Sequence, residues 1–245
     1  MKNILALLFI LPLIISCSKN SGSDNMNFLK FLFTKNNDKK EFSEEEWNNH
    51  YEKKEKAIEN ILGKMNELVG HAIIPFDIGG TVDMYYFSKH IKGTGFVTME
   101  LIKPDGSGPI PNKNGTYELI AFTKEKYINS KDVKKPFNII ERRICGIFTA
   151  IGNYSFQAKL EPGDTCEIPG EEGEPNIYLL FDEYTSNTNK FEINGNSHGL
   201  LLIIELFKDE LDFARSNGSK SIIEKLKESH YYPYTDMNRK SVLNN

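Results

Sequence analysis

Residues 199–207 (GLLLIIELF) are almost continuously apolar, and Glu205 is their single charged member. A strand with one solvated face alternates apolar and polar residues, whereas a strand covered on both faces is apolar throughout. The run therefore predicts a central strand that is buried on both sides. We expect Glu205 to pair with a Lys or Arg or to face the sheet edge, because an unpaired buried charge is costly.

A long amphipathic helix is predicted to begin at Ser43. Glu46 follows three residues later, which matches a capping box, and the two glutamates between them complement the helix dipole. Apolar side chains recur at helical spacing to about Gly70. The Glu/Lys run of residues 52–59 lies largely outside this apolar stripe, so we interpret it as a solvated face.

The rest of the chain alternates between strand and helix patterns. A second helix opens at Pro136 and ends at Gly152, and two short helices follow the apolar run. This order predicts an α+β domain over residues 43–245, in which helices flank a mostly antiparallel mixed sheet. The predicted strands cover residues 82–87, 96–102, 116–123, 166–168, 177–181, 191–193 and 199–207, and the short helices cover 208–217 and 219–228.

The N-terminus has the pattern of a bacterial lipoprotein signal peptide. Lys2 provides a positive start, residues 4–15 are apolar apart from Pro12, and residues 14–17 (IISC) match a lipobox. The apolar stretch is shorter than the ~20 residues that a membrane-spanning helix needs. A signal anchor with an incidental cysteine is the alternative interpretation.

This pattern divides the chain into three parts. We expect a cleaved signal peptide at residues 1–16, a lipid (palmitate) on Cys17 and a polar tether at residues 17–42. The lipid would hold the protein on a membrane of the bacterial cell envelope, facing an extracytoplasmic compartment. That compartment permits a disulfide between Cys145 and Cys166, although a buried thiol is the commoner fate of a cysteine in an apolar helix such as that around Cys145.

Composition and motif spacing argue against several function classes. The net charge is −4 with both signs mixed along the chain, which is not the electrostatic pattern of a nucleic-acid-binding protein. The five histidines have no metal-ligand spacing and the cysteines form no CxxC pair, so neither metal nor cofactor is expected.

His198, just before the central strand, could act as a general base if a carboxylate oriented it. A histidine bonded to backbone at a strand entry is the plainer interpretation.

The C-terminal part carries a family pattern. The apolar run is followed by a charged helix from Lys208, by Asn217-Gly218, by a second helix and by residues 236–242 (DMNRKSV). In this order the segments resemble the suppressor of fused family, and the last one is similar to the D-x-x-R-x-S-V ending of bacterial members. The strand order upstream fits the family as well, so the resemblance covers about residues 45–243.

The resemblance implies a binding module and not an enzyme. Animal relatives sequester a transcription factor by clamping a short peptide that adds as a strand, and bacterial relatives are associated with toxin–immunity gene neighbourhoods. We therefore expect a lipid-anchored, non-catalytic domain that binds a protein or peptide, with a toxin-neutralising immunity protein as its finer form. An extracytoplasmic hydrolase using His198 and a structural envelope lipoprotein are the alternatives. The candidate functional positions are His198, Glu205, Asp236 and Arg239.

Overall fold

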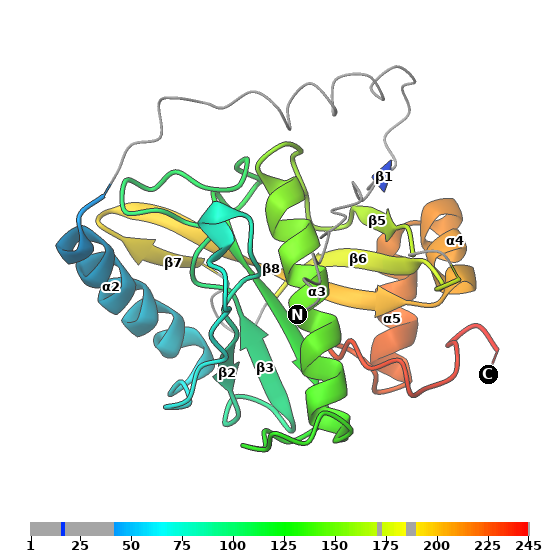
Figure 1. Ribbon diagram of the computed structural model, residues 1–245. Coiled ribbons are helices and arrows are strands. Elements are labelled where there is room, and N and C mark those ends of the chain that lie inside the picture. The colour runs from blue at the N-terminus through cyan, green and yellow to red at the C-terminus, as the bar shows by residue number, and fades with distance from the viewer. Residues whose placement is uncertain (1–15, 18–41, 171–172, 185–189, 245) are drawn as a thin grey trace, which may run out of the picture.

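The apolar run forms strand β8 (Asn196–Leu206), which lies at the centre of a mixed sheet (Figure 1). This computed structural model describes residues 16–17, 42–170, 173–184 and 190–244. Every residue of β8 from His198 to Leu206 is buried. The prediction of a central strand covered on both faces is therefore confirmed.

The strands follow the order β1-β5-β6-β8-β4-β3-β2 across the sheet. β7 is not part of this order and pairs with β8. β4 (Tyr117–Thr123) runs parallel to β8, and the other pairs of described strands are antiparallel. This confirms the predicted α+β class with a mostly antiparallel sheet. The remaining strands are β1 (Ser16–Cys17), β2 (Tyr85–Phe87), β3 (Thr94–Val97), β5 (Thr165–Ile168), β6 (Ile177–Glu183) and β7 (Lys190–Ile193).

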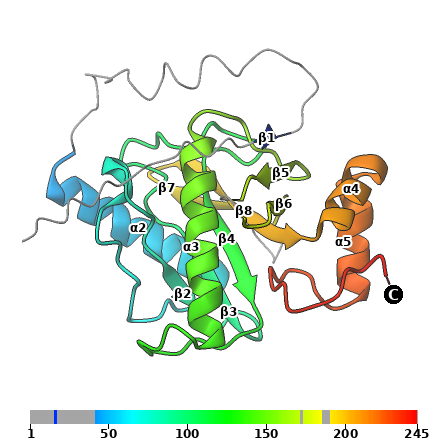
Figure 2. The same cartoon turned by 45° about the vertical axis from the view of Figure 1, so that its right-hand side comes forward.

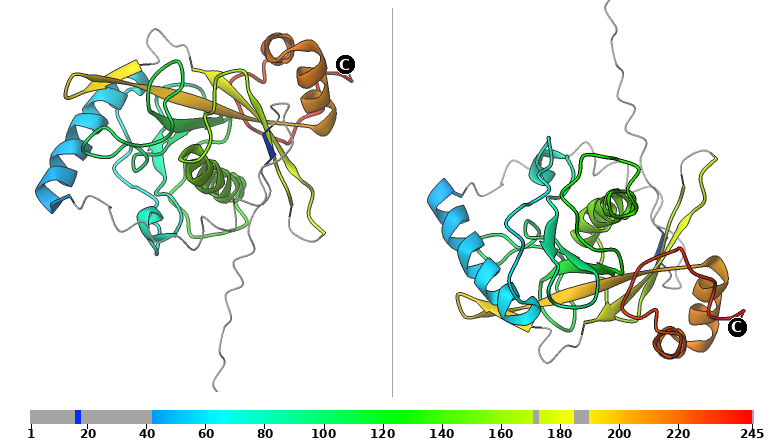
Figure 3. Two further views of the ribbon diagram at one scale, coloured as in Figure 1. Left: turned by 90° about the horizontal axis from the view of Figure 1, so that it is seen from above. Right: turned by 90° about the horizontal axis from the view of Figure 1, so that it is seen from below.

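Helices cover both faces of the sheet, with α3 (Pro136–Ser155) on the face opposite α5 (Ser219–Glu228) (Figures 2 and 3). α2 (Glu44–Leu62) and α4 (Lys208–Asn217) pack into the same core as α5. Successive side chains of β8 point to opposite faces. The strand therefore contributes side chains to the hydrophobic core on each face of the sheet. Leu200, Leu202, Ile204 and Leu206 face α2, α4 and α5, whereas Leu201 and Ile203 face α3.

Several predicted elements are shorter than expected, and β2 begins at Tyr85 rather than at Val82. α2 ends at Leu62 and not near Gly70, because Gly63 adopts a positive φ of 80° and its N–H donates to the Glu59 carbonyl. β3 ends at Val97 and does not reach residue 102. The N–H groups of residues 101 and 102 donate to the Glu118 carboxylate, which turns this segment away from the sheet.

The start of α3 at Pro136 is as predicted, but the helix continues past Gly152 to Ser155, so its predicted end is wrong. The Ser43 hydroxyl accepts from the Glu46 N–H at 3.2 Å, and the Glu46 carboxylate accepts from the Ser43 N–H at 2.8 Å. The predicted capping box is thus confirmed. α4 and α5 have the bounds that the sequence predicts.

The predicted signal peptide and tether fall mostly on residues 1–15 and 18–41, which lie outside the described residues. Ser16 and Cys17 form β1 and pair antiparallel with β5, with Ser16 opposite Glu167 and Cys17 opposite Cys166. Among the helices that the structure describes, none has both the length and the apolar character needed to cross a membrane.

The two cysteines of the folded domain are not joined to each other. Cys145 is half-buried on α3, and this burial raises the pKa of its thiol. Cys166 is fully buried in β5. The disulfide that the sequence left open between them is not formed in this structure.

A charge placed on β8 should unfold the domain. Ile203 is 1% exposed against α3, so Ile203→Asp buries a carboxylate that has no partner, and we expect a loss of more than about 4 kcal/mol in the free energy of unfolding. Asn196→Asp at the exposed start of the same strand is the control. Thermal melts monitored by circular dichroism test this, and an unchanged melting temperature in Ile203→Asp would contradict the central position of β8.

Candidate functional site

His198 is buried at the start of the apolar part of β8. Its Nδ1 lies 2.6 Å from the hydroxyl oxygen of Thr116, and its ring packs against Phe191 with the centroids 5.7 Å apart. Burial and the positive charge of Lys54 lower its pKa. Within the described chain the ring hydrogen-bonds to no carboxylate, so the His–carboxylate pair of a general base is not assembled at His198.

Glu205 forms an ion pair, as expected for a buried charged side chain. The guanidinium of Arg143, on α3, donates to both oxygens of the Glu205 carboxylate, with the Nε donor at 2.7 Å. The carboxylate side chain is 4% exposed, whereas that of Arg143 is 44% exposed. The expectation of a basic partner is therefore confirmed, and the pair joins β8 to α3.

The C-terminal segment completes the sheet between β4 and β8. The two parallel strands pair only as far as Ile120 and Leu202. Beyond that point the Thr235 N–H donates to the Phe122 carbonyl at 2.8 Å, and the Glu205 N–H donates to the Thr235 hydroxyl oxygen at 2.9 Å. The chain therefore fills the space between its own diverging strands.

Asp236 and Arg239 hold this segment in position. The Asp236 carboxylate accepts from the Thr123 hydroxyl and from the Lys124 N–H, the latter at 2.8 Å. The Arg239 guanidinium donates to both carboxylate oxygens of Glu210 on α4, at 2.5 and 2.8 Å, and both side chains are almost fully buried. Both candidate positions thus take part in contacts within the domain.

A second buried ion pair joins α2 to β4. Lys54 and Glu118 are both 0% exposed, and their charged groups are 2.7 Å apart. The ammonium also donates to the carbonyls of Met99 and Ile102, at 2.8 and 2.6 Å. Glu118 accepts from the Thr98 hydroxyl at 2.7 Å and from the Ile102 N–H at 3.0 Å. The pair therefore fixes the turn at residues 98–102.

His50 shares one of these acceptors. Its Nε2 lies 2.9 Å from the Ile102 carbonyl oxygen, which can only accept, so Nε2 carries the proton. Nδ1 is then left with a lone pair. Burial and the neighbouring Lys54 lower the pKa of His50 to about 4.

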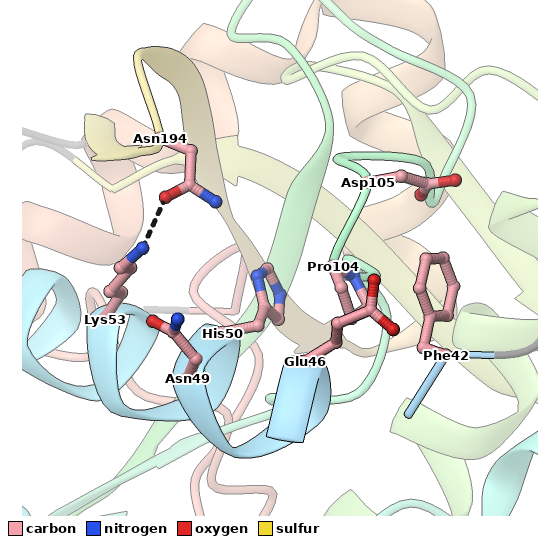
Figure 4. A pocket seen from close by; sticks show the side chains of 8 residues that line it. All are labelled: Phe42, Glu46, Asn49, His50, Lys53, Pro104, Asp105 and Asn194. Carbon is pink, nitrogen blue, oxygen red and sulfur yellow. Dashed lines mark hydrogen bonds between the residues drawn. The ribbon is translucent and has the colours of Figure 1, made fainter. Parts of the chain in front are cut away.

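A pocket of about 220 Å³ lies beside this histidine, between α2, the loop at Pro104 and the turn from β7 to β8 (Figure 4). In Figure 4 the His50 ring points from α2 into the middle of the pocket. The lining residues are Phe42, Glu46, Asn49, His50, Lys53, Pro104, Asp105 and Asn194.

Sequence reasoning missed the buried polar face of α2. We interpreted residues 52–59 as a solvated face, which is wrong for Lys54. The available signal was the spacing of four between His50, Lys54, Ile58 and Leu62, the buried residues of this helix. The ion pair with Glu118 could not be read from the sequence, because its partner is 64 residues away. Across the described residues no group of His, Cys, Asp or Glu has a metal-binding arrangement.

The architecture defines a single α+β sheet domain whose C-terminal segment is built into the sheet. The suppressor of fused protein (SUFU) family matches residues 93–240, and the chain belongs to this family.

One solved structure supports the same fold, and a second is similar over part of its length. The crystal structure of a Sufu–Fu complex is similar to this chain with a TM-score of 0.56 and 17% identity, covering 80% of this chain and 93% of the other. The crystal structure of Drosophila Suppressor of Fused matches with a TM-score of 0.46 and 17% identity, covering 66% of this chain and 43% of the Drosophila chain. The comparison with curated proteins gives no match.

Breaking the Arg239–Glu210 pair should destabilise the domain strongly. Arg239→Ala leaves a buried carboxylate without its cation, and we expect a loss of about 3–5 kcal/mol in the free energy of unfolding. Lys208→Ala is the control, because it breaks an exposed pair with Asp212 on α4 that water screens and that contributes little to stability. Urea unfolding measures both losses. Equal losses would contradict the structural role of Arg239.

Proposed function

We propose that this protein is a lipid-anchored member of the suppressor of fused family that binds a protein partner and catalyses no reaction. Membership of the family supports the binding role. One similar solved structure is a complex of Sufu with Fu, and we extend protein binding from that complex to this chain as part of the proposal.

The observation that carries the proposal is the pairing of β5 with an extended segment. Ser16 and Cys17 add to the outer edge of β5 as a short antiparallel strand. An edge strand offers unpaired N–H and carbonyl groups to any extended chain. Cleavage before Cys17 would remove Ser16, so the processed protein would offer the edge at Glu167 to a partner.

Glu167 is the residue of β5 that can test this edge. The Asp164 carbonyl accepts from the Phe181 N–H of β6, and backbone groups of an antiparallel strand alternate between its two neighbours. The N–H groups of Thr165 and Glu167 therefore point away from β6, toward the outer edge. Glu167 is also the residue opposite Ser16.

The finer form of the proposal is an immunity protein that neutralises a toxin. A lipid on Cys17 would hold the domain at the envelope membrane, where an incoming toxin arrives. Because Cys17 lies along β5, such a lipid would also bring this edge of the sheet near the membrane.

Partner binding should depend on the β5 edge and not on His198. Glu167→Pro removes the outward N–H from an edge strand, where proline is tolerated. We expect it to abolish capture of the partner from envelope membranes by the processed protein, which begins at Cys17. Glu167→Ala is the matched control, since it loses the same side-chain contacts with Asn176 and Arg215 but keeps the N–H.

The capture assay, combined with a substrate assay, separates binding from catalysis. His198→Ala should capture the partner as well as the wild type, and neither protein should turn over ester, peptide or glycoside substrates. Turnover by the wild type that disappears in folded His198→Ala would overturn the binding proposal.

Lipid attachment should depend on Cys17. We expect Cys17→Ala to take up no fatty-acid analogue in metabolic labelling and to lose stable association with membranes. Cys166→Ala is the control, because this thiol is buried in β5. Full labelling of Cys17→Ala would contradict the anchor.

A further inference from the structure

Exposed apolar side chains gather around the two ends of α3. The described chain has seven large apolar side chains that are exposed, and six of them lie on α3 or on the segments next to its ends. These six are Ile73, Ile74, Ile78, Val133, Ile139 and Phe156. Single apolar residues scattered over a surface are ordinary, but a set on one side of a protein marks an interaction surface.

The six side chains form one group at each end of the helix. The first group surrounds the 3₁₀ helix η1 (Phe76–Ile78), and the ring of Phe76 packs against that of Phe156 at the C-terminal end of α3, with the centroids 6.4 Å apart. Val133 and Ile139 lie at the N-terminal end. Figure 3 shows both segments on the α3 side of the sheet. Because α3 has 20 residues, the two groups are separated by a helix about 30 Å long.

The segment that leads into α3 is basic. Residues 124–135, which we call the basic loop, contain five lysines and two acidic residues, a net charge of +3 in a chain whose net charge is −4. All five lysines are exposed, and none of them forms an ion pair with another described residue. The first turn of α3 has no acidic residue that would offset them. The lysines are Lys124, Lys126, Lys131, Lys134 and Lys135.

Hydrogen bonds to α3 hold the basic loop in a fixed shape. The side-chain amide of Asn138 donates to the carbonyls of Ser130 and Asp132, both at 2.8 Å. The guanidinium of Arg142 donates to the Val133 carbonyl at 2.7 Å. These backbone groups are bound to the helix, whereas the side chain of Val133 is 56% exposed. A surface that binds the loop would therefore meet a preformed arrangement and would pay little for ordering it.

This combination of charge and apolar side chains matches the surface of an anionic bilayer. Lysines are attracted to anionic headgroups, and their aliphatic stems can lie along apolar neighbours. Val133 and Ile139 can enter the boundary between headgroups and acyl chains, where interfacial proteins place apolar side chains. A bilayer is also continuous, so it can contact both ends of a helix about 30 Å long at once.

We propose that α3, η1 and the basic loop together form a face that docks on an anionic phospholipid bilayer, with the axis of α3 parallel to the membrane. We call this surface the α3 face. The proposal goes beyond the proposed function and rests on it only for the presence of a membrane near the domain.

Tryptophan fluorescence tests the docking. Trp47 is the single tryptophan of the chain, and its helix α2 packs on the opposite face of the sheet. The full chain is added to vesicles of phosphatidylcholine and phosphatidylglycerol with brominated acyl chains, which quench a tryptophan that reaches them. We expect Ile73→Trp and Val133→Trp each to lose the emission of the added tryptophan, while the wild type keeps its emission.

Absence of quenching in either variant, or quenching of Trp47 in the wild type, would overturn the proposal. Ile73 is 100% exposed and Val133 is more than half exposed, so both variants should fold. If Val133→Trp fails to fold, Ile139→Trp at the same end of α3 takes its place.

The basic loop is tested in the Ile73→Trp background. Lys131→Gln, Lys134→Gln and Lys135→Gln are combined in one variant. Each lysine beside an anionic bilayer strengthens binding about fivefold, so we expect half-maximal quenching to need about a hundredfold more lipid. Vesicles of phosphatidylcholine alone should not quench the reporter.

A second triple variant is the matched control. Lys56→Gln, Lys190→Gln and Lys220→Gln remove the same charge from exposed positions outside the α3 face, and we expect them to leave the quenching unchanged. An equal shift in the two triple variants, or equal quenching by the two lipid compositions, would contradict the proposal.

The outcomes separate this face from the β5 edge and from the lipid anchor. The titration contains no partner, so its failure leaves the Glu167→Pro result standing, and loss of the strand-binding proposal leaves a positive titration standing. A lipid on Cys17 would hold the protein on both kinds of vesicle, so it does not explain quenching that requires phosphatidylglycerol. If neither reporter is quenched and the basic-loop variant fails to capture the partner, the α3 face binds an acidic protein and the bilayer assignment is wrong.

Discussion

The fully buried ion pair between Lys54 and Glu118 is the contact on which the N-terminal half of the domain depends. Two buried charges are tolerated only when each is paired and its remaining hydrogen-bonding capacity is used. Lys54 meets this requirement through two backbone carbonyls, and Glu118 through Thr98 and the N–H of Ile102. The pair thus joins α2, β4 and the turn at residues 98–102. Because His50 shares the Ile102 carbonyl with Lys54, the same contact fixes the imidazole at the pocket.

The C-terminal half depends on a similar arrangement around β8. Glu205 pairs with Arg143 on one side of the sheet, and Glu210 pairs with Arg239 beside α4. The second pair holds residues 234–236 between the diverging ends of β4 and β8. The D-x-x-R-x-S-V ending is therefore explained by contacts within the domain. We propose that partner recognition uses a different feature of the domain, the outer edge of β5.

Periodicity and capping signals predicted much of the fold, including β8, the start of α2 and both bounds of α4 and α5. These signals are local, so a single sequence contains them. The end of β3 and the burial of Lys54 were missed, because both depend on Glu118, which is distant in sequence. Of the candidate positions, the pairing of Glu205 followed from the cost of a lone buried charge. The pocket did not, since it joins residues from α2, a loop and a β-turn.

The central claim is that a partner adds as a strand to the outer edge of β5. Hydrogen exchange on the processed protein, measured with and without the captured partner, tests it most directly. The account predicts that the amides of Thr165 and Glu167 exchange more slowly in the complex, while those of β7 are unchanged. Unchanged exchange at Thr165 and Glu167 in a complex whose partner is fully bound would contradict it.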